Sequence, residues 1–263
     1  MDTKQKNENI IEVSDLTKYY GNFLAVNKIN FQVKKGEIFG FLGPNGAGKT
    51  TTIKMLTGLA KPSYGNARIN KKDIIKQTVE VKKIIGVVTE DSNLYEELTV
   101  ADNLRFMGQL YDVSKSEREN RIKELLNILG IENKKDVKFA KLSKGMKRKV
   151  TIAAALVHNP LILFLDEPTT GLDVLSARVL RTMIKELNKK GATIFLTTHY
   201  IEEAEQLCDT VAIIVDGKIK IVDTPKNLKL KTKSKSLEEA FINLTELKEE
   251  VMLVEKGEKI NNE

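Results

Sequence analysis

The strongest constraint in this sequence is an apolar run that leads into a glycine-rich loop. Residues 38–42 are almost wholly apolar, and residues 43–50 read Gly-Pro-Asn-Gly-Ala-Gly-Lys-Thr. The pattern of glycine, four residues, glycine, lysine and threonine lets successive backbone N–H groups turn inward around phosphate oxygens. Residues 51–59 then have helical spacing and stop before Pro62. The segment therefore predicts a strand, a phosphate-binding loop and a helix.

Each part of this loop has a predicted role. Lys49 would reach the β- and γ-phosphates of a nucleotide, and Thr50 would offer its hydroxyl to Mg²⁺. The helix that begins here adds the positive end of its dipole to the site. The candidate nucleotide-binding residues of the loop are Gly43, Pro44, Asn45, Gly46, Ala47, Gly48, Lys49, Thr50 and Thr51.

A second apolar run ends in two carboxylates. Residues 161–165 are Leu-Ile-Leu-Phe-Leu, and Asp166 and Glu167 follow at once. A buried strand that ends in acids is the arrangement a magnesium nucleotide site needs opposite its glycine loop. Asp166 is the predicted magnesium ligand, and Glu167 could accept a proton from the water that attacks the γ-phosphate. The alternative is that the two acids are an ordinary pair on the surface. A phosphate-binding loop with an acidic strand end also occurs in kinases, GTPases, helicases and transport ATPases, so these two elements alone do not identify the class of protein.

The rest of the chain alternates between strand and helix patterns, with one interruption. Residues 10–13 and 29–33 predict an opening pair of strands, and residues 91–140 predict a helical insertion. After it, strands are expected over 161–165 and 192–197 and helices up to 190 and over 201–207, which favours a parallel sheet. Asp216-Gly217 predicts a tight hairpin between strands 211–215 and 218–222. The final apolar stripe, which we expect to pack on the domain, comprises Leu237, Ala240, Phe241, Leu244, Leu247 and Val251.

Composition indicates a folded protein of the cytoplasm. The 263 residues carry a net charge of +7, and the basic residues are interspersed with acids and lack an aromatic platform, so no nucleic acid is expected as a partner. No apolar stretch is long enough to span a bilayer, and residues 1–9 are polar, unlike a secretory signal. The one cysteine, Cys208, is expected to be a small buried residue without chemistry.

The residues that distinguish between the nucleotide-binding classes lie just ahead of the acidic strand. They read Leu142-Ser143-Lys144-Gly145-Met146 and precede a predicted helix. Ser143 can cap that helix, and its hydroxyl, the Gly145 N–H and the helix dipole together make a second anion-binding surface. A plain helix cap is the simpler interpretation. The five residues resemble the signature sequence of the ABC ATPase family.

This resemblance extends over almost the whole chain and implies a P-loop NTPase (ABC ATPase) fold of the α/β class. The fold has a mainly parallel sheet, an N-terminal antiparallel β part and an α-helical insertion. By the same resemblance, Tyr20 would stack on adenine, with Tyr19 as a competitor, and His199 would bind the γ-phosphate and orient water. His158 is expected to be structural. Residues 170–173, which end at Asp173, resemble the loop after the acidic pair.

In ABC proteins the signature contacts ATP bound to the facing subunit. The resemblance thus implies a head-to-tail dimer with a second copy or a paralogue, sandwiching two ATP molecules with Mg²⁺. The interface residues would be Leu142, Ser143, Lys144, Gly145, Met146 and Asp173. A separate multi-spanning permease would hold the dimer at the inner face of the membrane.

Three positions depart from the usual family pattern. Glu90 stands where the family carries a glutamine that touches Mg²⁺, and a carboxylate can serve as a ligand there. Lys144 and Met146 replace a glycine and a glutamine, a variation that is similar to the bacterial drug-, antibiotic- and sodium-exporter branch. The ending at residues 236–241 also resembles that branch, so export is favoured over import.

The sequence is accordingly interpreted as the ATPase subunit of an ABC exporter. Residues 1–232 would form the ATPase domain, with the insertion at about 91–140 continuing through the signature helix to 158, and residues 233–263 a helical appendage and polar tail. Two rivals are a non-transport ABC protein acting on ribosomes or DNA and a P-loop kinase. The first would need a tandem domain or coiled coil that this sequence lacks, and the second gives no role to the signature or to His199.

Overall fold

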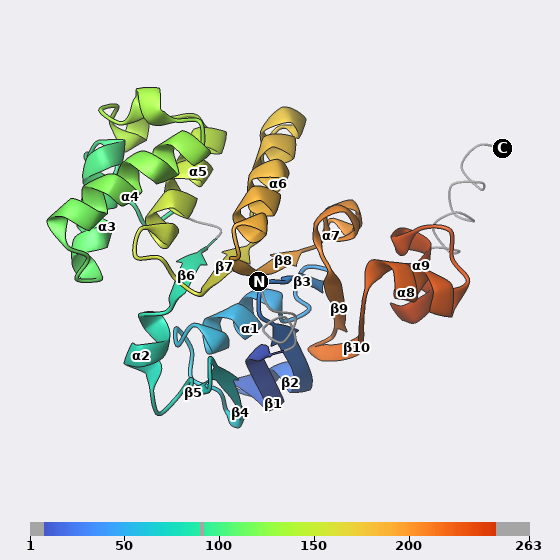
Figure 1. Cartoon of the computed structure of the whole chain (residues 1–263). Helices are drawn as coiled ribbons and strands as arrows, with labels where there is room; N and C mark the ends of the chain where they lie inside the picture. Colours follow the sequence, from blue (N-terminus) through green and yellow to red (C-terminus); the bar gives the residue numbers. More distant parts are fainter. Residues whose placement is uncertain (1–7, 90–91, 246–263) are drawn as a thin grey trace.

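The computed structural model describes residues 8–89 and 92–245 and arranges them around two sheets (Figure 1). Within these residues, the larger sheet has strand order β10-β9-β3-β8-β7-β6 and the smaller β2-β1-β4-β5. The larger sheet consists of β3 (Ile38–Leu42), β6 (Ile85–Val88), β7 (Ile162–Asp166), β8 (Thr193–Thr198), β9 (Thr210–Val215) and β10 (Lys218–Asp223). The smaller consists of β1 (Asn9–Tyr20), β2 (Phe23–Lys34), β4 (Tyr64–Ile69) and β5 (Lys72–Asp73).

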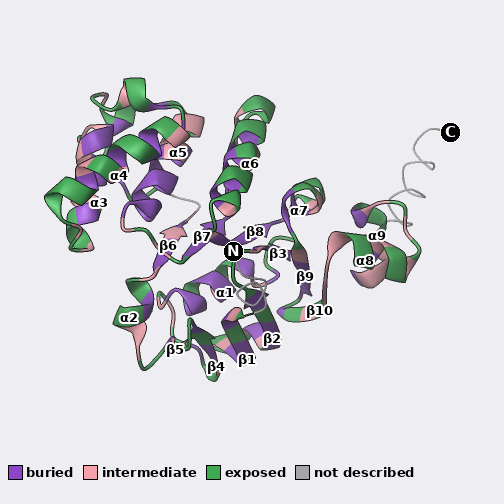
Figure 2. Cartoon of the chain, in the orientation of Figure 1, coloured by how far each residue is buried: buried purple, intermediate pink, exposed green. Residues whose placement is uncertain are grey.

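The larger sheet is parallel except at one edge. Strands β9, β3, β8, β7 and β6 run parallel, and β10 pairs antiparallel with β9. Every residue of β3, β7 and β8 is buried, because both faces of the sheet are covered (Figure 2). Strands buried on two faces have continuous apolar runs rather than alternation, which is the pattern that residues 38–42 and 161–165 predicted. The predicted α/β fold with a mainly parallel sheet is confirmed.

The antiparallel sheet is larger than the sequence predicted. Strands β1 and β2 pair along most of their length, far beyond residues 10–13 and 29–33. Register shifts interrupt the pairing, and Asp15 and Lys28 have left-handed φ angles of 48° and 46°. These irregularities break the period-two alternation of apolar side chains, so the sequence pattern revealed only the regular ends of the strands.

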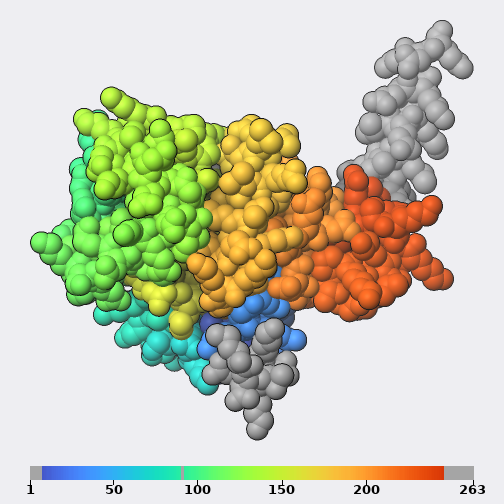
Figure 3. Space-filling view, turned by 45° about the horizontal axis from the view of Figure 1, so that its top comes forward, coloured from blue at the N-terminus to red at the C-terminus, as the bar shows by residue number. Residues whose placement is uncertain are grey.

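Helices cover the sheet in two groups. Close to the strands lie α1 (Lys49–Leu56), α2 (Thr78–Lys82), α6 (Val174–Lys189) and α7 (Ile201–Leu207). A separate group of α3 (Val100–Leu110), α4 (Lys115–Ile128) and α5 (Lys144–Leu156) gathers beside the edge strand β6 (Figure 1). Figure 3 shows this group, in green, on one side of α6 and the C-terminal helices, in red, on the other. The helical insertion thus packs at the β6 edge of the larger sheet, on α5.

Aromatic rings fill the space between the two sheets. Phe31 of β2 stacks on Phe39 of β3 with ring centroids 5.4 Å apart, and Phe39 stacks on Phe195 of β8 at 5.5 Å. Phe41 and Phe164 lie against the same Phe195 ring. Offset aromatic pairs of this kind add to the apolar burial that joins the sheets. This core lies under the glycine loop and fixes the position of β3, from which the loop emerges.

The predicted hairpin at the end of the larger sheet is confirmed. Asp216 and Gly217 have φ angles of 49° and 71°, as a two-residue hairpin turn requires. The turn is also attached to its surroundings, since the Gly217 N–H donates to the Ala47 carbonyl (3.2 Å) and the Asn27 N–H donates to the Gly217 carbonyl (2.8 Å). A Cβ at Gly217 would lie 2.8 Å from the Ala25 carbonyl oxygen, so only glycine fits without movement of the backbone.

The C-terminal apolar stripe packs on the rest of the domain, as its sequence pattern predicted. Helix α9 (Leu237–Thr245) buries Leu237, Ala240 and Phe241, and it contacts α7 and β10. Leu247 and Val251 of the stripe lie outside the described residues. The sequence pattern does not predict α8 (Pro225–Thr232), because Leu228 is its one fully buried side chain and lysines are frequent among the rest. No helix among residues 8–89 and 92–245 is long and apolar enough to cross a membrane.

His158 is a structural residue whose burial predicts a pH effect. Its Nε2 lies 2.9 Å from the Ile85 carbonyl, to which it must donate, and its ring stacks on Tyr111 with centroids 3.7 Å apart. The Nδ1 atom is buried and has no partner among the described residues, so a second proton there would find no acceptor. Burial lowers the pKa of His158, although the hydrogen bond to Ile85 opposes this effect.

We expect the chain to lose stability when the pH falls through the ordinary pKa of histidine, because the unfolded chain then takes up a proton that the folded chain refuses. The stabilising effect is complete above that pKa and is lost below it. Melting wild type and His158→Gln between about pH 8 and pH 5.5 tests this expectation. The melting temperature of the variant should fall less steeply; parallel slopes would contradict the assignment.

Candidate functional site

The glycine loop connects β3 to α1 and opens onto a cavity of about 400 Å³. Gly46 and Gly48 have φ angles of 83° and 99°, a left-handed conformation that favours glycine. A Cβ at Gly48 would lie 2.6 Å from the Ala25 carbonyl oxygen. Helix α1 starts at Lys49 without a capping side chain and without an acid in its first turn. Its N–H groups and dipole are thus available to an anion.

Lys49 is held at the centre of this loop. Its side chain is 5% exposed, and its ammonium group donates to the carbonyls of Gly43 (2.8 Å) and Pro44 (3.0 Å). The same nitrogen lies 3.1 Å from Oε1 of Glu167. A buried ammonium is stable only when it is paired in this way. The loop and the acidic strand are thus joined by an ion pair at the position where phosphate is expected.

Asp166 lies at the end of β7, beside the loop. Its Oδ1 accepts hydrogen bonds from the hydroxyl groups of Thr50 (3.2 Å) and Thr197 (2.6 Å). The residue is 4% exposed. Because Asp166 pairs with Thr197 in the β7–β8 register, the strand ends bring these oxygens together. Oxygen atoms of a carboxylate and a hydroxyl at this spacing suit Mg²⁺, so the side chains present fit the ion that the sequence predicts.

Glu167 follows at the first position beyond β7 and has a left-handed φ of 49°. A non-glycine residue in this region carries about 1–2 kcal/mol of strain, which surrounding contacts must offset. Its N–H donates to the Thr197 carbonyl (3.2 Å) and hydroxyl (3.0 Å). Its Oε2 accepts a hydrogen bond from Thr170 (2.9 Å). The backbone conformation directs the carboxylate toward the loop rather than along the strand.

Burial raises the pKa of the Glu167 carboxyl, but the hydrogen bond and positive charge of Lys49, assisted by Thr170 and His199, outweigh this effect. The pKa therefore lies below its ordinary value, and Glu167 is ionised at neutral pH. A carboxylate in this state can accept a proton from water.

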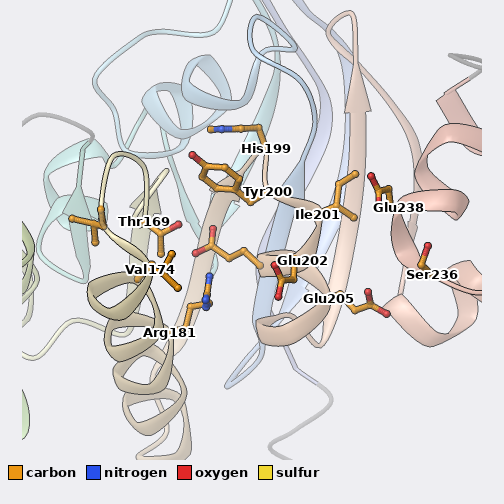
Figure 4. A pocket seen from close by; sticks show the side chains of 13 residues that line it. Thr169, Val174, Arg181, His199, Tyr200, Ile201, Glu202, Glu205, Ser236 and Glu238 are labelled. Atoms are coloured by element: carbon orange, nitrogen blue, oxygen red, sulfur yellow. The ribbon is translucent and has the colours of Figure 1, made fainter. Parts of the chain in front are cut away.

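His199 follows β8 and faces the same carboxylate. Its Nδ1 lies 2.5 Å from Oε2 of Glu167, and its ring lies 4.0 Å from that of Tyr200. A second cavity of about 730 Å³ begins at His199 and Tyr200 and extends between α6 and α7 to Ser236 and Glu238 (Figure 4). His199 thus lines both cavities and forms part of the wall between them.

Two aromatic side chains form the outer rim of the smaller cavity. Tyr20 is 46% exposed and Phe23 is 65% exposed, and both line it. Tyr19, the competing candidate, instead packs edge-on against Tyr64 with ring centroids 6.3 Å apart. Sequence reasoning missed Phe23; an aromatic residue directly after the Gly21 turn was the available signal. Exposed aromatic faces at this rim suit a flat ring such as a nucleobase.

The signature lies elsewhere on the surface. Ser143 caps α5 by accepting a hydrogen bond from the Met146 N–H (3.3 Å), as the sequence predicted. Gly145 faces Ser176 of α6, and the ammonium group of Lys144 lies over Gly171. Asp173 caps α6 through the Ser176 N–H (2.9 Å). Residues 142–146 are absent from the described lining of the cavity beside Lys49.

The structure thus brings most predicted residues to one cavity and separates the rest. Asn45, Gly46, Gly48, Lys49, Thr50, Thr51, Tyr20, Glu167 and His199 line it. Gly43 and Pro44 contact Lys49 from behind, Ala47 is buried in the loop, and Asp166 meets Thr50. Ser143, Lys144, Gly145 and Met146 lie at the start of α5 and Asp173 caps α6, whereas Leu142 is buried in the core. Glu90 lies outside the described residues.

Comparison with known proteins identifies the family. A family model described as ABC transporter matches residues 26–170, which is more than half of the chain. The chain belongs to the ABC transporter family. It is an ATP-binding subunit of this family with ATPase activity.

Individual relatives agree with this ABC transporter assignment. The chain is 40% identical over 219 residues to the linearmycin resistance ATP-binding protein LnrL of Bacillus subtilis, covering 83% of this chain and 70% of that protein. It is 38% identical over 242 residues to the probable multidrug ABC transporter ATP-binding protein YbhF of Escherichia coli, covering 90% of this chain and 42% of that one. A solved ATP-binding subunit of an ABC transporter superposes with a TM-score of 0.81 at 34% identity over 90% of this chain and 99% of that chain. The predicted resemblance to the drug- and antibiotic-exporter branch is confirmed.

Proposed function

We propose that this ATPase works as a head-to-tail dimer that drives export through a separate permease. The observation that carries the proposal is the separation of two anion-binding surfaces on one chain. The cavity of Lys49 and Glu167 can hold a nucleotide, whereas Ser143 and Gly145 at the N-terminus of α5 are not among the described residues that line it. A second copy or paralogue, turned head to tail, would place its own nucleotide against that surface.

Exposed apolar residues near the signature support a protein interface there. Val174 and Leu175, at the start of α6, are 80% and 73% exposed. They follow Asp173 and lie on the same helix as Ser176, which touches Gly145. Large apolar side chains this exposed favour a surface that another protein covers.

In the proposed site, Lys49 and the loop N–H groups bind the phosphates and Tyr20 stacks on adenine. Thr50 and Asp166 would hold Mg²⁺, and the ion would neutralise charge on the β- and γ-phosphates. We propose Glu90 as a further ligand of Mg²⁺. Glu167 accepts a proton from the water that attacks the γ-phosphorus, and His199 orients that water. The bond between the γ-phosphorus and the bridging oxygen breaks, which leaves ADP and phosphate.

Export and membrane attachment follow from the relatives and stay part of the proposal. LnrL is named a linearmycin resistance protein, and YbhF is named a probable multidrug ABC transporter protein. We therefore propose that the transported molecule is a drug-like compound or an antibiotic. By analogy with these relatives, we propose that a multi-spanning permease holds the dimer at the inner face of the membrane. No nucleic acid takes part.

Affinity purification from detergent-solubilised native membranes tests the permease. Tagged Glu167→Gln, loaded with ATP and Mg²⁺, should recover a multi-spanning membrane protein. Recovery of ribosomes or nucleic acid without such a protein would contradict the transport proposal.

Charge at Ser143 provides a test of the dimer. Aspartate caps helices as well as serine does, so Ser143→Asp should keep α5 intact but place a carboxylate against the partner's γ-phosphate. We expect this change in the Glu167→Gln background to abolish the ATP-dependent doubling of mass in light scattering, while ATP still binds the chain.

The matched control for this test is Ser114→Asp, since Ser114 caps α4 in the same way through the Glu117 N–H. It should leave the dimer unchanged. Equal dimerisation of both variants would argue against a phosphate contact at Ser143.

A further inference from the structure

Arg148 is a buried arginine on α5 that none of the predicted roles uses. It is 8% exposed and lies in the second turn of the helix that starts at the signature. One guanidinium nitrogen, Nη1, donates to the Thr89 carbonyl (2.6 Å), and the other, Nη2, donates to the Glu167 carbonyl (3.4 Å). A single side chain of α5 thus bridges the residues that follow β6 and β7.

The second of these carbonyls belongs to the proposed catalytic base. The peptide N–H of Glu167 is already fixed from β8 by Thr197, and its φ of 49° lies in the left-handed region. Arg148 binds the carbonyl on the other side of the same residue. A charged donor makes a stronger hydrogen bond to a carbonyl than a neutral donor does. Thr197 and Arg148 together therefore hold the backbone that directs the carboxylate.

Arg148 lies on the same helix as the signature residues, so a movement of that helix would also move Arg148. Ser143 and Gly145, one turn earlier on the same helix, form the surface proposed to face the partner's nucleotide. A displacement of α5 on closure of the dimer would move the guanidinium relative to β6 and β7. Through the hydrogen bond from Arg148 to the Glu167 carbonyl, that displacement would also move the backbone of Glu167.

We propose that Arg148 is a positioning residue that links the signature helix to the catalytic carboxylate of Glu167. It acts through the Glu167 backbone, and the inference rests on Glu167 being the general base. The loop N–H groups and Lys49 would hold the phosphates directly, so a small displacement of Glu167 should change the affinity for ATP less than it changes kcat.

Steady-state hydrolysis by the full-length chain, with ATP and Mg²⁺, tests the inference in Arg148→Met and Arg148→Lys. The first removes the charge and the donors while keeping an apolar stem; the second keeps the charge and one donor group. We expect Arg148→Met to lower kcat by on the order of 10–100-fold, as displacement of a catalytic group by up to about an ångström does. The KM for ATP should stay within about twofold of wild type. Arg148→Lys should recover part of the loss.

Arg118 provides a matched control. It is also 8% exposed, lies on α4, and donates to the Val113 carbonyl (3.3 Å) away from the cavity. Arg118→Met should cost stability but leave kcat unchanged. Equal falls of kcat and of melting temperature in the Arg118 and Arg148 variants would reduce Arg148 to a structural residue. A rise of KM alone would also overturn the inference.

A double substitution separates this inference from the role of Glu167. In the Glu167→Gln background, Arg148→Met should change the residual single-turnover rate little, because both changes act on one group. Multiplying effects would overturn the link, whereas wild-type kcat in Glu167→Gln would remove the general base itself. If Arg148→Met does not fold, Arg148→Lys with wild-type kcat would overturn the proposal.

Discussion

Glu167→Gln is expected to lower the kcat for ATP hydrolysis by about 10²–10⁴-fold, the contribution of a general base. Glutamine has almost the shape of glutamate and can still receive a hydrogen bond from Thr170, but it cannot take up the proton of the attacking water. Lys49 and the loop keep their geometry, so ATP should bind at least as tightly as in wild type. Phosphate release measured under saturating ATP, together with the dissociation constant of ATP, separates the two effects.

Glu186→Gln is the matched control for that substitution. Glu186 lies near the end of α6 and pairs with Lys189 in an exposed ion pair of 2.7 Å. Its loss should leave kcat unchanged, since exposed ion pairs contribute little. A Glu167→Gln variant that hydrolyses ATP at the rate of this control would exclude Glu167 as the base and direct attention to His199.

Lys49→Met should weaken ATP binding by on the order of 100-fold or more, because it removes charge-assisted hydrogen bonds to phosphate worth about 1.5–3 kcal/mol each. The substitution has a second consequence. Glu167 would lose the cation that holds the pKa of its carboxyl down, so that pKa should rise as burial becomes dominant. Any residual hydrolysis should therefore decline at a higher pH than wild-type hydrolysis does as the solution is acidified. Titration with a fluorescent ATP analogue measures the affinity.

Lys54→Met serves as the control on the same helix. Lys54 is exposed on α1, one turn beyond Lys49, so its ammonium group should not contribute to the cavity. Its substitution should leave ATP affinity within about twofold of wild type, as most surface changes do. Equal weakening in both variants would mean that general positive charge, rather than the buried ammonium, attracts the nucleotide.

Local sequence patterns predicted those parts of the site that are contiguous in the chain. The strand, glycine loop and helix around Lys49 require only a few neighbouring residues, and so does the acidic end of β7. Helix limits were predicted to within a few residues where apolar spacing was regular, as in α7. Where spacing was irregular, as in β1 with its register shifts, the pattern fell short.

Contacts across elements could not be predicted in the same way. Thr197 meets Asp166 because β7 and β8 pair in a particular register, and neither segment alone has a sequence pattern that predicts this register. Arg148 reaches Glu167 through the docking of α5, in a run of basic residues that resembles a solvated helix face. The exposure of Phe23 at the cavity rim depends on the β1–β2 turn. These features follow from tertiary packing rather than from local propensity.

The bond from the Gly217 N–H to the Ala47 carbonyl joins the phosphate loop to a turn near the opposite end of the sequence. The Gly217 proton can exchange with solvent only when this bond opens, so its exchange rate measures how often the loop leaves its resting conformation. A ligand that stiffens the loop would therefore slow exchange at a peptide group it never touches. The β9–β10 turn thus gives the loop a remote reporter, one that reads its local opening without any label in the cavity.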